Sequence, residues 1–488
     1  MVITRRSGKL VVFAACAALV GLCAPAASAG KRPSDGGGGK PDTPKEWDER
    51  VLPFVDFVEE QRELEFDHPV KVRFLSDNEL EKELRSENDA QTKADREFEQ
   101  QIAGEFRALG LVSDEVDLGQ ASEDLAADNV LGYYDSLTET LVVRDQGSDS
   151  IDADVTVVHE LTHALQDQHF DLDRLYRGAK SGSEGFALDF LLEGDATTVE
   201  TAYIETLSRA EQDEYFGLIG EITSEPLPEG VPYALNVFSA APYVLGKAYV
   251  FALDPDGGTT GRDRAFRNPP ETEEVLLDPV ALEQRQSAKK VPKPALEEGE
   301  ERAYAPEQFG AFSLYLMFAT RFDVRTALAA VTGWGGDSYV GFKEDGDICL
   351  RGNVTGDRRT DTDELEEALT MWAAAMPDGA SEIDRDGDVI TFTACASEGV
   401  TEPTVEQFNS AFYNVLGGRI YTVLDVASFG IPLDSSLCVG DLVSTDPEIV
   451  AIYDLSFAEG RDLTDDEYDE LDAVYLEAFD TCGVDPPS

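Results

Sequence analysis

Residues 155–166 read V-T-V-V-H-E-L-T-H-A-L-Q, and this stretch sets the interpretation of the whole chain. Apolar side chains surround the polar ones on most sides, which is typical of a buried helix. Positions four apart lie one turn above each other on a helix, so His159 and His163 can each offer an imidazole nitrogen to one metal ion. Glu160 can take a proton from a water molecule at that metal. The stretch predicts a zinc hydrolase with Zn²⁺ as cofactor, the histidines as ligands and Glu160 as general base.

Chance is the simplest alternative explanation for so short a motif. The chain contains only 4 histidines in 488 residues, however, and two of them fall at the spacing of the motif. A buried helix that carries two imidazoles and a carboxylate needs a partner for them, because unpaired polar groups are costly to bury. A metal ion supplies that partner, so the sequence predicts a metal site here.

Two residues compete for the third ligand position, His169 and Glu193. His169 follows His163 at the spacing of H-E-x-x-H-x-x-G-x-x-H, but Gln166 occupies the position of the glycine that turns the chain. If the helix continues, His169 is rotated by about 240° from His163. Glu193 lies in F-A-L-D-F-L-L-E-G-D (186–195), on an apolar helix face where a lone carboxylate is costly unless it is bound. We therefore predict a His, His, Glu site with one open position, and a solvated Glu193 at the helix edge is the alternative.

Several segments resemble secreted bacterial zinc metallopeptidases of the gluzincin, or peptidase MA-like, kind. They are H-E-L-T-H-A-L-Q-D-Q-H-F-D-L (159–172), L-L-E-G-D-A (191–196), G-Y-Y-D (132–135), P-Y-V-L-G-K-A-Y-V-F-A-L (242–253), N-P-P-E-T-E-E-V-L (268–276) and G-W-G-G-D-S-Y (333–339). The resemblance implies a zincin-like fold with the ligands and base named above, and it specifies no substrate. One departure is Leu277-Asp278-Pro279, where the group carries His-Pro after V-L.

The expected fold class is α+β. It comprises a mainly helical zincin-like metallopeptidase core with a small edge β-sheet, a β-β-α-β-β module and a C-terminal disulfide-linked helical appendage. The expected divisions are a signal peptide (1–29), a flexible linker (30–46), a metallopeptidase domain including an N-terminal subdomain (47–337), a small α+β module (338–398) and a helical C-terminal domain (399–488).

The N-terminus has the pattern of an export signal. Basic residues precede an apolar run (10–24), and A-S-A at 27–29 is a small-residue cleavage site. The pattern predicts a secreted, extracellular protein and leaves lipid anchoring at Cys16 or Cys23 open. A second apolar run (234–253) is interrupted by proline, glycine and lysine, so it predicts a buried helix and no stable membrane span after removal of the signal.

Four cysteines follow the signal peptide. An even number of cysteines in an exported chain indicates disulfides, and four cysteines allow three connectivities. We expect Cys349 to pair with Cys395 and Cys438 with Cys482, because each pair then stays within one predicted module.

The chain is strongly acidic, with a formal net charge of -59 from 39 Lys and Arg against 98 Asp and Glu. Such a charge repels nucleic acid and anionic membranes, so neither is an expected partner. The expected partner is a peptide or protein substrate, while no pattern specifies an oligomeric state. The alternative function is that of a noncatalytic, exported, zinc-stabilised protein that binds a surface partner.

Two further elements are expected around the metal. Residues 132–144 form two β-rich runs separated by a polar turn, which predicts a hairpin. In gluzincins an edge strand binds the substrate backbone; residues 141–143 are the candidate, and an ordinary sheet edge is the alternative. Because no histidine follows His169, Tyr203 or Tyr243 would have to stabilise the oxyanion, unless both are core tyrosines.

Overall fold

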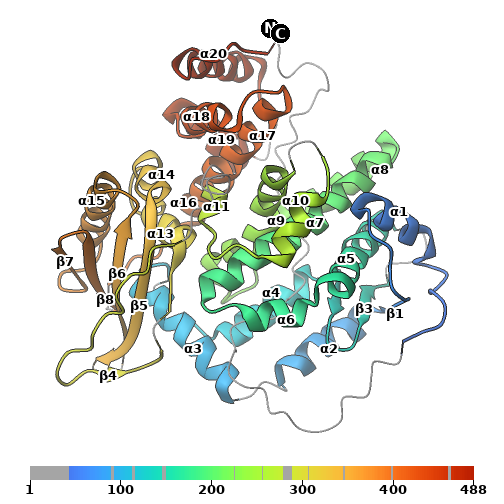
Figure 1. Cartoon of the computed structure of the whole chain (residues 1–488), viewed down its shortest axis with the longest axis horizontal. Helices are drawn as coiled ribbons and strands as arrows, with labels where there is room; N and C mark the ends of the chain where they lie inside the picture. Colours follow the sequence, from blue (N-terminus) through green and yellow to red (C-terminus); the bar gives the residue numbers. More distant parts are fainter. Residues whose placement is uncertain are drawn as a thin grey trace. The chain divides into compact units, whose positions relative to one another are not determined.

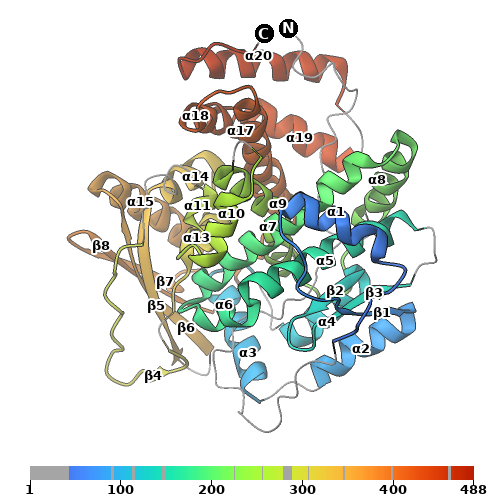
Figure 2. The same ribbon diagram turned by 45° about the vertical axis from the view of Figure 1, so that its right-hand side comes forward.

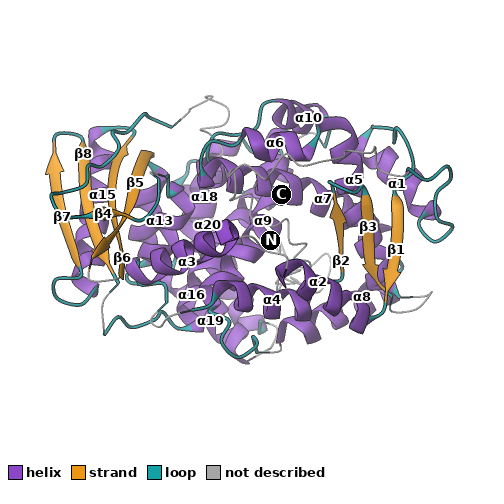
Figure 3. Cartoon of the chain, turned by 90° about the horizontal axis from the view of Figure 1, so that it is seen from below, coloured by secondary structure: helices purple, strands orange, loops and turns teal. Residues whose placement is uncertain are grey.

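The computed structural model describes residues 43–89, 93–112, 116–145, 150–224, 226–254, 257–277, 288–305, 307–344, 347–396, 399–459 and 463–487. The predicted signal peptide (1–29) and residues 30–42 of the predicted linker lie outside these residues. Of the described residues, 60% are helical and 13% lie in strands, with small sheets, which confirms the α+β class (Figures 1 and 3). The described residues divide into an N-terminal unit, within 43–103 and 116–271, and a C-terminal unit, within 104–112 and 272–487.

The N-terminal unit contains a three-stranded mixed sheet and most of the long helices. Its strands are β1 (Lys71–Leu75), β2 (Gly132–Asp135) and β3 (Thr140–Arg144). Its helices are α1 (Leu52–Arg62), α2 (Asp77–Asp89), the first part of α3 (Lys93–Ala108), α4 (Leu118–Asn129), α5 (Ile151–Phe170), α6 (Leu172–Gly178), α7 (Gly182–Thr206), α8 (Arg209–Ser224), α9 (Tyr233–Leu253) and α10 (Thr260–Arg267).

The predicted hairpin is present, but the prediction that residues 141–143 form an edge strand is wrong. The strand order is β1-β3-β2, so β3 is the central strand. It pairs with β2 on one side, antiparallel, and with β1 on the other, parallel. Strand β1 lies far upstream in the sequence, and its pairing leaves no local signal. Among the described strands, β1 and β2 are the edges of this sheet.

Helix α5 packs its apolar side on this sheet. Its buried residues Val157, Val158 and Leu161 share one hydrophobic cluster with Leu141 and Val143 of β3. Leucine and valine side chains on the facing helix and strand remove each other from water, and this burial holds the helix in place. The helix continues without a turn through position 166 and ends at Asp171, whose φ is 57°.

Helices α7 and α9 cross at backbone contact. A β-carbon at Gly194 of α7 would lie 2.2 Å from the carbonyl carbon and oxygen of Gly246 in α9, and one at Gly246 would lie 2.4 Å from the carbonyl oxygen of Phe190. Only glycine permits this approach. The predicted buried helix around 234–253 is thus confirmed as α9, and among the described helices none has the length and apolar composition needed to cross a membrane.

The C-terminal unit contains a five-stranded antiparallel sheet of order β4-β5-β6-β8-β7 (Figure 3). The strands are β4 (Glu301–Arg302), β5 (Trp334–Glu344), β6 (Asp347–Gly356), β7 (Ser381–Asp386) and β8 (Val389–Cys395). Before and after β5 and β6 come α11 (Glu274–Leu277), α13 (Gly310–Ala319), α14 (Val324–Thr332) and α15 (Arg359–Ala375). Trp372 of α15 packs against Phe392 of β8, which places this helix on the sheet.

The last part of the C-terminal unit is helical. It comprises α16 (Val405–Asn409), the π-helix η1 (Ser410–Gly417), α17 (Gly418–Ser428), α18 (Leu433–Ser444), α19 (Pro447–Glu459) and α20 (Asp465–Thr481), which Figure 2 shows from a second direction. Both predicted disulfides are confirmed. Cys349–Cys395 joins directly paired residues of β6 and β8, and Cys438–Cys482 joins α18 to the end of α20.

Candidate metal centre

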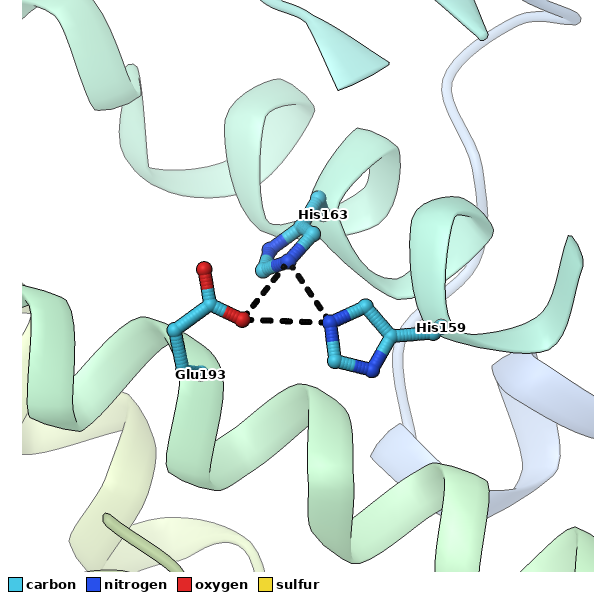
Figure 4. A group of neighbouring side chains, drawn as sticks. All are labelled: His159, His163 and Glu193. Carbon is cyan, nitrogen blue, oxygen red and sulfur yellow. Dashed lines mark hydrogen bonds and ion pairs between the residues drawn. The ribbon is translucent and has the colours of Figure 1, made fainter. Parts of the chain in front are cut away.

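Three side chains from two helices converge on one point in the N-terminal unit (Figure 4). Helix α5 supplies His159 and His163 one turn apart, and α7 supplies Glu193. The two Nε2 atoms are 3.1 Å apart, and Glu193 Oε2 lies 3.1 Å from His159 Nε2 and 3.3 Å from His163 Nε2. All three side chains are buried, with 1%, 7% and 4% exposure.

The triangle has the dimensions of a zinc site. Bonds of about 2.0 Å in tetrahedral geometry place neighbouring ligand atoms about 3.3 Å apart. The observed edges of 3.1 to 3.3 Å match that value before any ion is added. Among the described residues no fourth histidine, cysteine or carboxylate joins the group, so a bound ion would keep a position free.

Glu200 sets the orientation of His159. Its Oε2 lies 2.9 Å from His159 Nδ1, and Glu200 is 2% exposed. A carboxylate can only accept, so Nδ1 carries the proton of this hydrogen bond. The lone pair of the neutral ring is then on Nε2, the atom that faces Glu193 and His163.

Gln166 has the same role at His163. Its Oε1 lies 3.0 Å from His163 Nδ1, so this ring also places its Nε2 lone pair inside the triangle. Two nitrogen lone pairs and an anionic oxygen therefore face one another at hydrogen-bond distance. Such a group of acceptors is stable only around a cation, either protons or a metal ion.

The pKa shifts in the cluster indicate that its carboxylates need positive charge beside them. Burial opposes ionisation of Glu193, but the two histidines lower the pKa of its carboxyl group to about 2. Burial likewise opposes charging of His159, yet its hydrogen bonds to Glu193 and Glu200 raise its pKa well above the ordinary value. In the metal-free protein the imidazoles thus hold protons that balance the carboxylates. A divalent cation would displace these protons and supply the same charge.

Glu160 lies beside the triangle and not in it. Its side chain is 2% exposed, and burial raises its pKa. Strand β2 passes close to it, because a β-carbon at Gly132 would lie 2.6 Å from Thr156 Cγ2 and 3.5 Å from Glu160 Cγ. The glycine lets the edge strand approach the carboxylate that the sequence predicts as general base.

The other three candidate residues of the sequence differ in whether they lie at the cluster. His169 lies outside the group, and its Nε2 contacts the carbonyl oxygen of Glu65 at 2.8 Å on the surface. Tyr203 packs edge-on against Phe54 and Phe57 in the core. Tyr243 is at the cluster, since its ring stacks on His159 with centroids 5.9 Å apart.

Two functional neighbours were absent from the sequence prediction, Glu200 and Gln166. Glu200 follows Glu193 by seven residues, which is two helical turns and therefore the same face. Gln166 follows His163 by three, again on one face. Both spacings are visible in the sequence, but the bond of Glu200 to His159 needs the two helices to be placed together, and the Gln166 amide is oriented toward His163 by its contacts with α7.

A second group, Glu344 with Cys349 and Cys395, has ligand atoms at metal-binding distance, but its cysteines form a disulfide and offer no thiolate. No protein-family model, curated protein or solved structure matches this chain. The chemistry of the cluster is therefore argued from its own residues and distances.

Proposed function

We propose that this protein is a secreted zinc metallopeptidase of the gluzincin type, in which His159, His163 and Glu193 hold Zn²⁺. The observation that carries the proposal is the triangle of three buried acceptor atoms with zinc-like edges. The free position and the adjacent Glu160 favour a catalytic site over a structural one, since structural zinc sites are closed by four protein ligands.

The proposed zincin-like core consists of α5, α7 and the three-stranded sheet. The first two ligands are on a helix packed against the sheet, and the third comes from the following long helix. This arrangement, together with the resemblance of residues 159–172 and 191–196 to gluzincins, supports the assignment. Two disulfides are compatible with an oxidising, extracellular compartment.

Bound Zn²⁺ supplies Lewis acidity, which polarises a carbonyl group and acidifies water. The chain's own contribution is Glu160, which accepts a proton from the attacking water and delivers it to the leaving amine nitrogen. Burial raises the pKa of Glu160, so the carboxyl group retains the proton long enough to transfer it. Glu200 and Gln166 hold the two imidazoles in the tautomer that presents Nε2.

The substrate peptide is proposed to lie along β2. This strand is an edge of the sheet among the described strands, and Gly132 brings it next to Glu160. An extended peptide adds to a sheet edge through backbone hydrogen bonds. Tyr243 is the one tyrosine of the two candidates at the cluster, so it is the candidate for stabilising the oxyanion.

The first test measures zinc content and peptidase activity in the purified mature protein. Glu193→Gln should lose zinc, whereas His169→Ala, which alters a surface histidine, should keep one zinc per chain. The wild type should cleave an unfolded protein, and Glu160→Gln should bind zinc without cleaving. Zinc loss in His169→Ala would contradict the assigned ligand set. Tight zinc binding with no cleavage by the wild type would favour the noncatalytic, surface-binding function.

A further inference from the structure

A buried chain of polar contacts reaches His163 from the side opposite the triangle. It begins at Gln166, which is 1% exposed and whose Oε1 lies 3.0 Å from His163 Nδ1. The amide nitrogen of Gln166 lies 3.1 Å from the carbonyl oxygen of Leu192 and 2.9 Å from Asp195 Oδ2. One glutamine thus connects a metal ligand on α5 with the backbone and a carboxylate of α7.

Asp195 is itself held between two arginines. Its side chain is fully buried, Oδ2 accepts from Arg62 Nε at 2.8 Å, and Oδ1 accepts from Arg262 Nη1 at 2.9 Å. Arg62 also contacts Asp263 at 3.2 Å, and Arg262 Nε lies 3.8 Å from Asp254. The charges alternate along this chain, so Asp195 is a stabilised anion at its centre.

This arrangement decides which way the Gln166 amide faces. The carbonyl oxygen of Leu192 and the carboxylate of Asp195 can only accept, so the amide NH₂ group must point toward them. The amide oxygen is then directed at His163, where it can only accept from Nδ1–H. A flipped amide would place its oxygen against the Leu192 carbonyl oxygen and the Asp195 carboxylate, losing both of those hydrogen bonds.

We infer that Gln166 is a positioning residue for His163, and that Asp195, clamped by Arg62 and Arg262, acts on the metal site through Gln166. The inference rests on the proposed metal site, and it adds two residues that would raise the affinity of this site for zinc. Because the amide is locked, His163 presents its Nε2 lone pair before the ion arrives, and the site binds zinc without first selecting a ring orientation.

Gln166→Met tests the glutamine directly. Methionine has a similar length, and Asp195 keeps its two arginine partners, so the fold should be retained. The zinc dissociation constant, measured by competition with a chromophoric chelator, should rise by about 10- to 100-fold. The visible spectrum of the Co²⁺ form should also change, because its bands report the coordination geometry.

The matched control is Gln168→Met on the same helix. Gln168 also makes three hydrogen bonds, to the backbone of Asp67 and His68, but none to a metal ligand. This variant should keep the wild-type zinc affinity and Co²⁺ spectrum. An equal loss of zinc affinity in both variants would show that the change at Gln166 acts by general destabilisation of α5. That result would overturn the inference.

Asp195→Asn tests the connection through a double-mutant cycle. Alone, it should weaken zinc binding less than Gln166→Met, because Leu192 still holds the amide. In the Gln166→Met background it should have no further effect on zinc affinity, since the residue through which it acts is gone. Additive losses would overturn the role of Asp195. If Asp195→Asn does not fold, Gln166→Met and Gln168→Met still decide the role of the glutamine.

These outcomes separate the inference from the proposed function. A wild type that binds no zinc contradicts the metal site itself. A wild type that binds zinc tightly, with Gln166→Met binding equally tightly and giving the same Co²⁺ spectrum, leaves the metal site in place and overturns the positioning role.

Discussion

Two of the buried carboxylates of helix α7, Glu193 and Asp195, lie in opposite surroundings on its two sides. They are two residues apart and therefore point about 200° away from each other around the helix. Asp195 contacts two arginines and a glutamine NH₂ group, so the chain itself supplies its cations and donors. Glu193 contacts two imidazole nitrogens whose other nitrogens are already used as donors. A buried anion with partners from the chain is structural, whereas one that faces only further acceptors needs a cation from solution.

The largest loss of stability is expected from a substitution next to Asp195. Arg62→Met leaves Asp195 with Arg262 and Asp263 with Arg267, but it removes the cation of a buried ion pair, so it should lower the free energy of unfolding by about 3–5 kcal/mol. Urea denaturation followed by circular dichroism measures this change. Arg177→Met is the control, because Arg177 pairs with Asp173 on the surface and should change stability by less than about 1 kcal/mol. Equal losses of stability in the two variants would contradict the prediction that the buried ion pair contributes more than the exposed one.

Metal removal tests whether an ion bound at Glu193 stabilises the fold. Free zinc at about a thousand times the dissociation constant should stabilise the folded protein by about 4 kcal/mol, because the ion binds the folded state alone. Thermal denaturation with zinc and with a chelator should therefore differ clearly for the wild type. The same pair of measurements should coincide for Glu193→Gln. A zinc-dependent shift of equal size in that variant would show that the ion stabilises the protein elsewhere.

The position of both carboxylates depends on the glycine between them. Gly194→Ala places a β-carbon 2.2 Å from the Gly246 backbone and should separate α7 from α9, at about 1–3 kcal/mol. Gly185→Ala is the matched control on the same helix, where a β-carbon meets nothing within 4 Å. It should be stabilising by about 0.5–1 kcal/mol, because alanine favours the helix. Denaturant midpoints measure the stability of both variants. An unchanged stability of Gly194→Ala would contradict the close crossing of α7 and α9.

The smallest change in stability is expected from another carboxylate of α7, Asp189, which accepts a hydrogen bond from Tyr176 Oη at 2.7 Å. Burial raises its pKa to about 7, so the folded protein binds this proton more tightly than the unfolded chain. Stability should therefore decrease as pH rises from about 4 to about 7 and become constant above. Because the side chain is half-buried, the difference should be about 1–2 kcal/mol. In metal-free protein, Asp189→Asn should remove this part of the pH dependence, and an unchanged profile would contradict the raised pKa.

Local sequence patterns determined much of the candidate site. The four-residue spacing of His159 and His163 defines a common helix face whatever surrounds the helix. The absence of glycine at position 166 indicated that the helix would continue and carry His169 away, and α5 does continue to Phe170. The parity and grouping of the cysteines predicted both disulfides. The histidine spacing and the helix continuation depend on neighbours in the chain, and the disulfides were predicted from the number and grouping of the cysteines, so the sequence contains this information directly.

Tertiary structure decided the rest, because it depends on which distant segments meet. Strand β3 became central only through its parallel pairing with β1, which no local alternation of residues encodes. The hydrogen bond of Glu200 to His159, and those of Gln166 to Leu192 and Asp195, arise only once α7 lies beside α5. The sequence by itself determined which residues could bind a metal. Only the packing of the helices decided that three of them face one another at the distances of a zinc site.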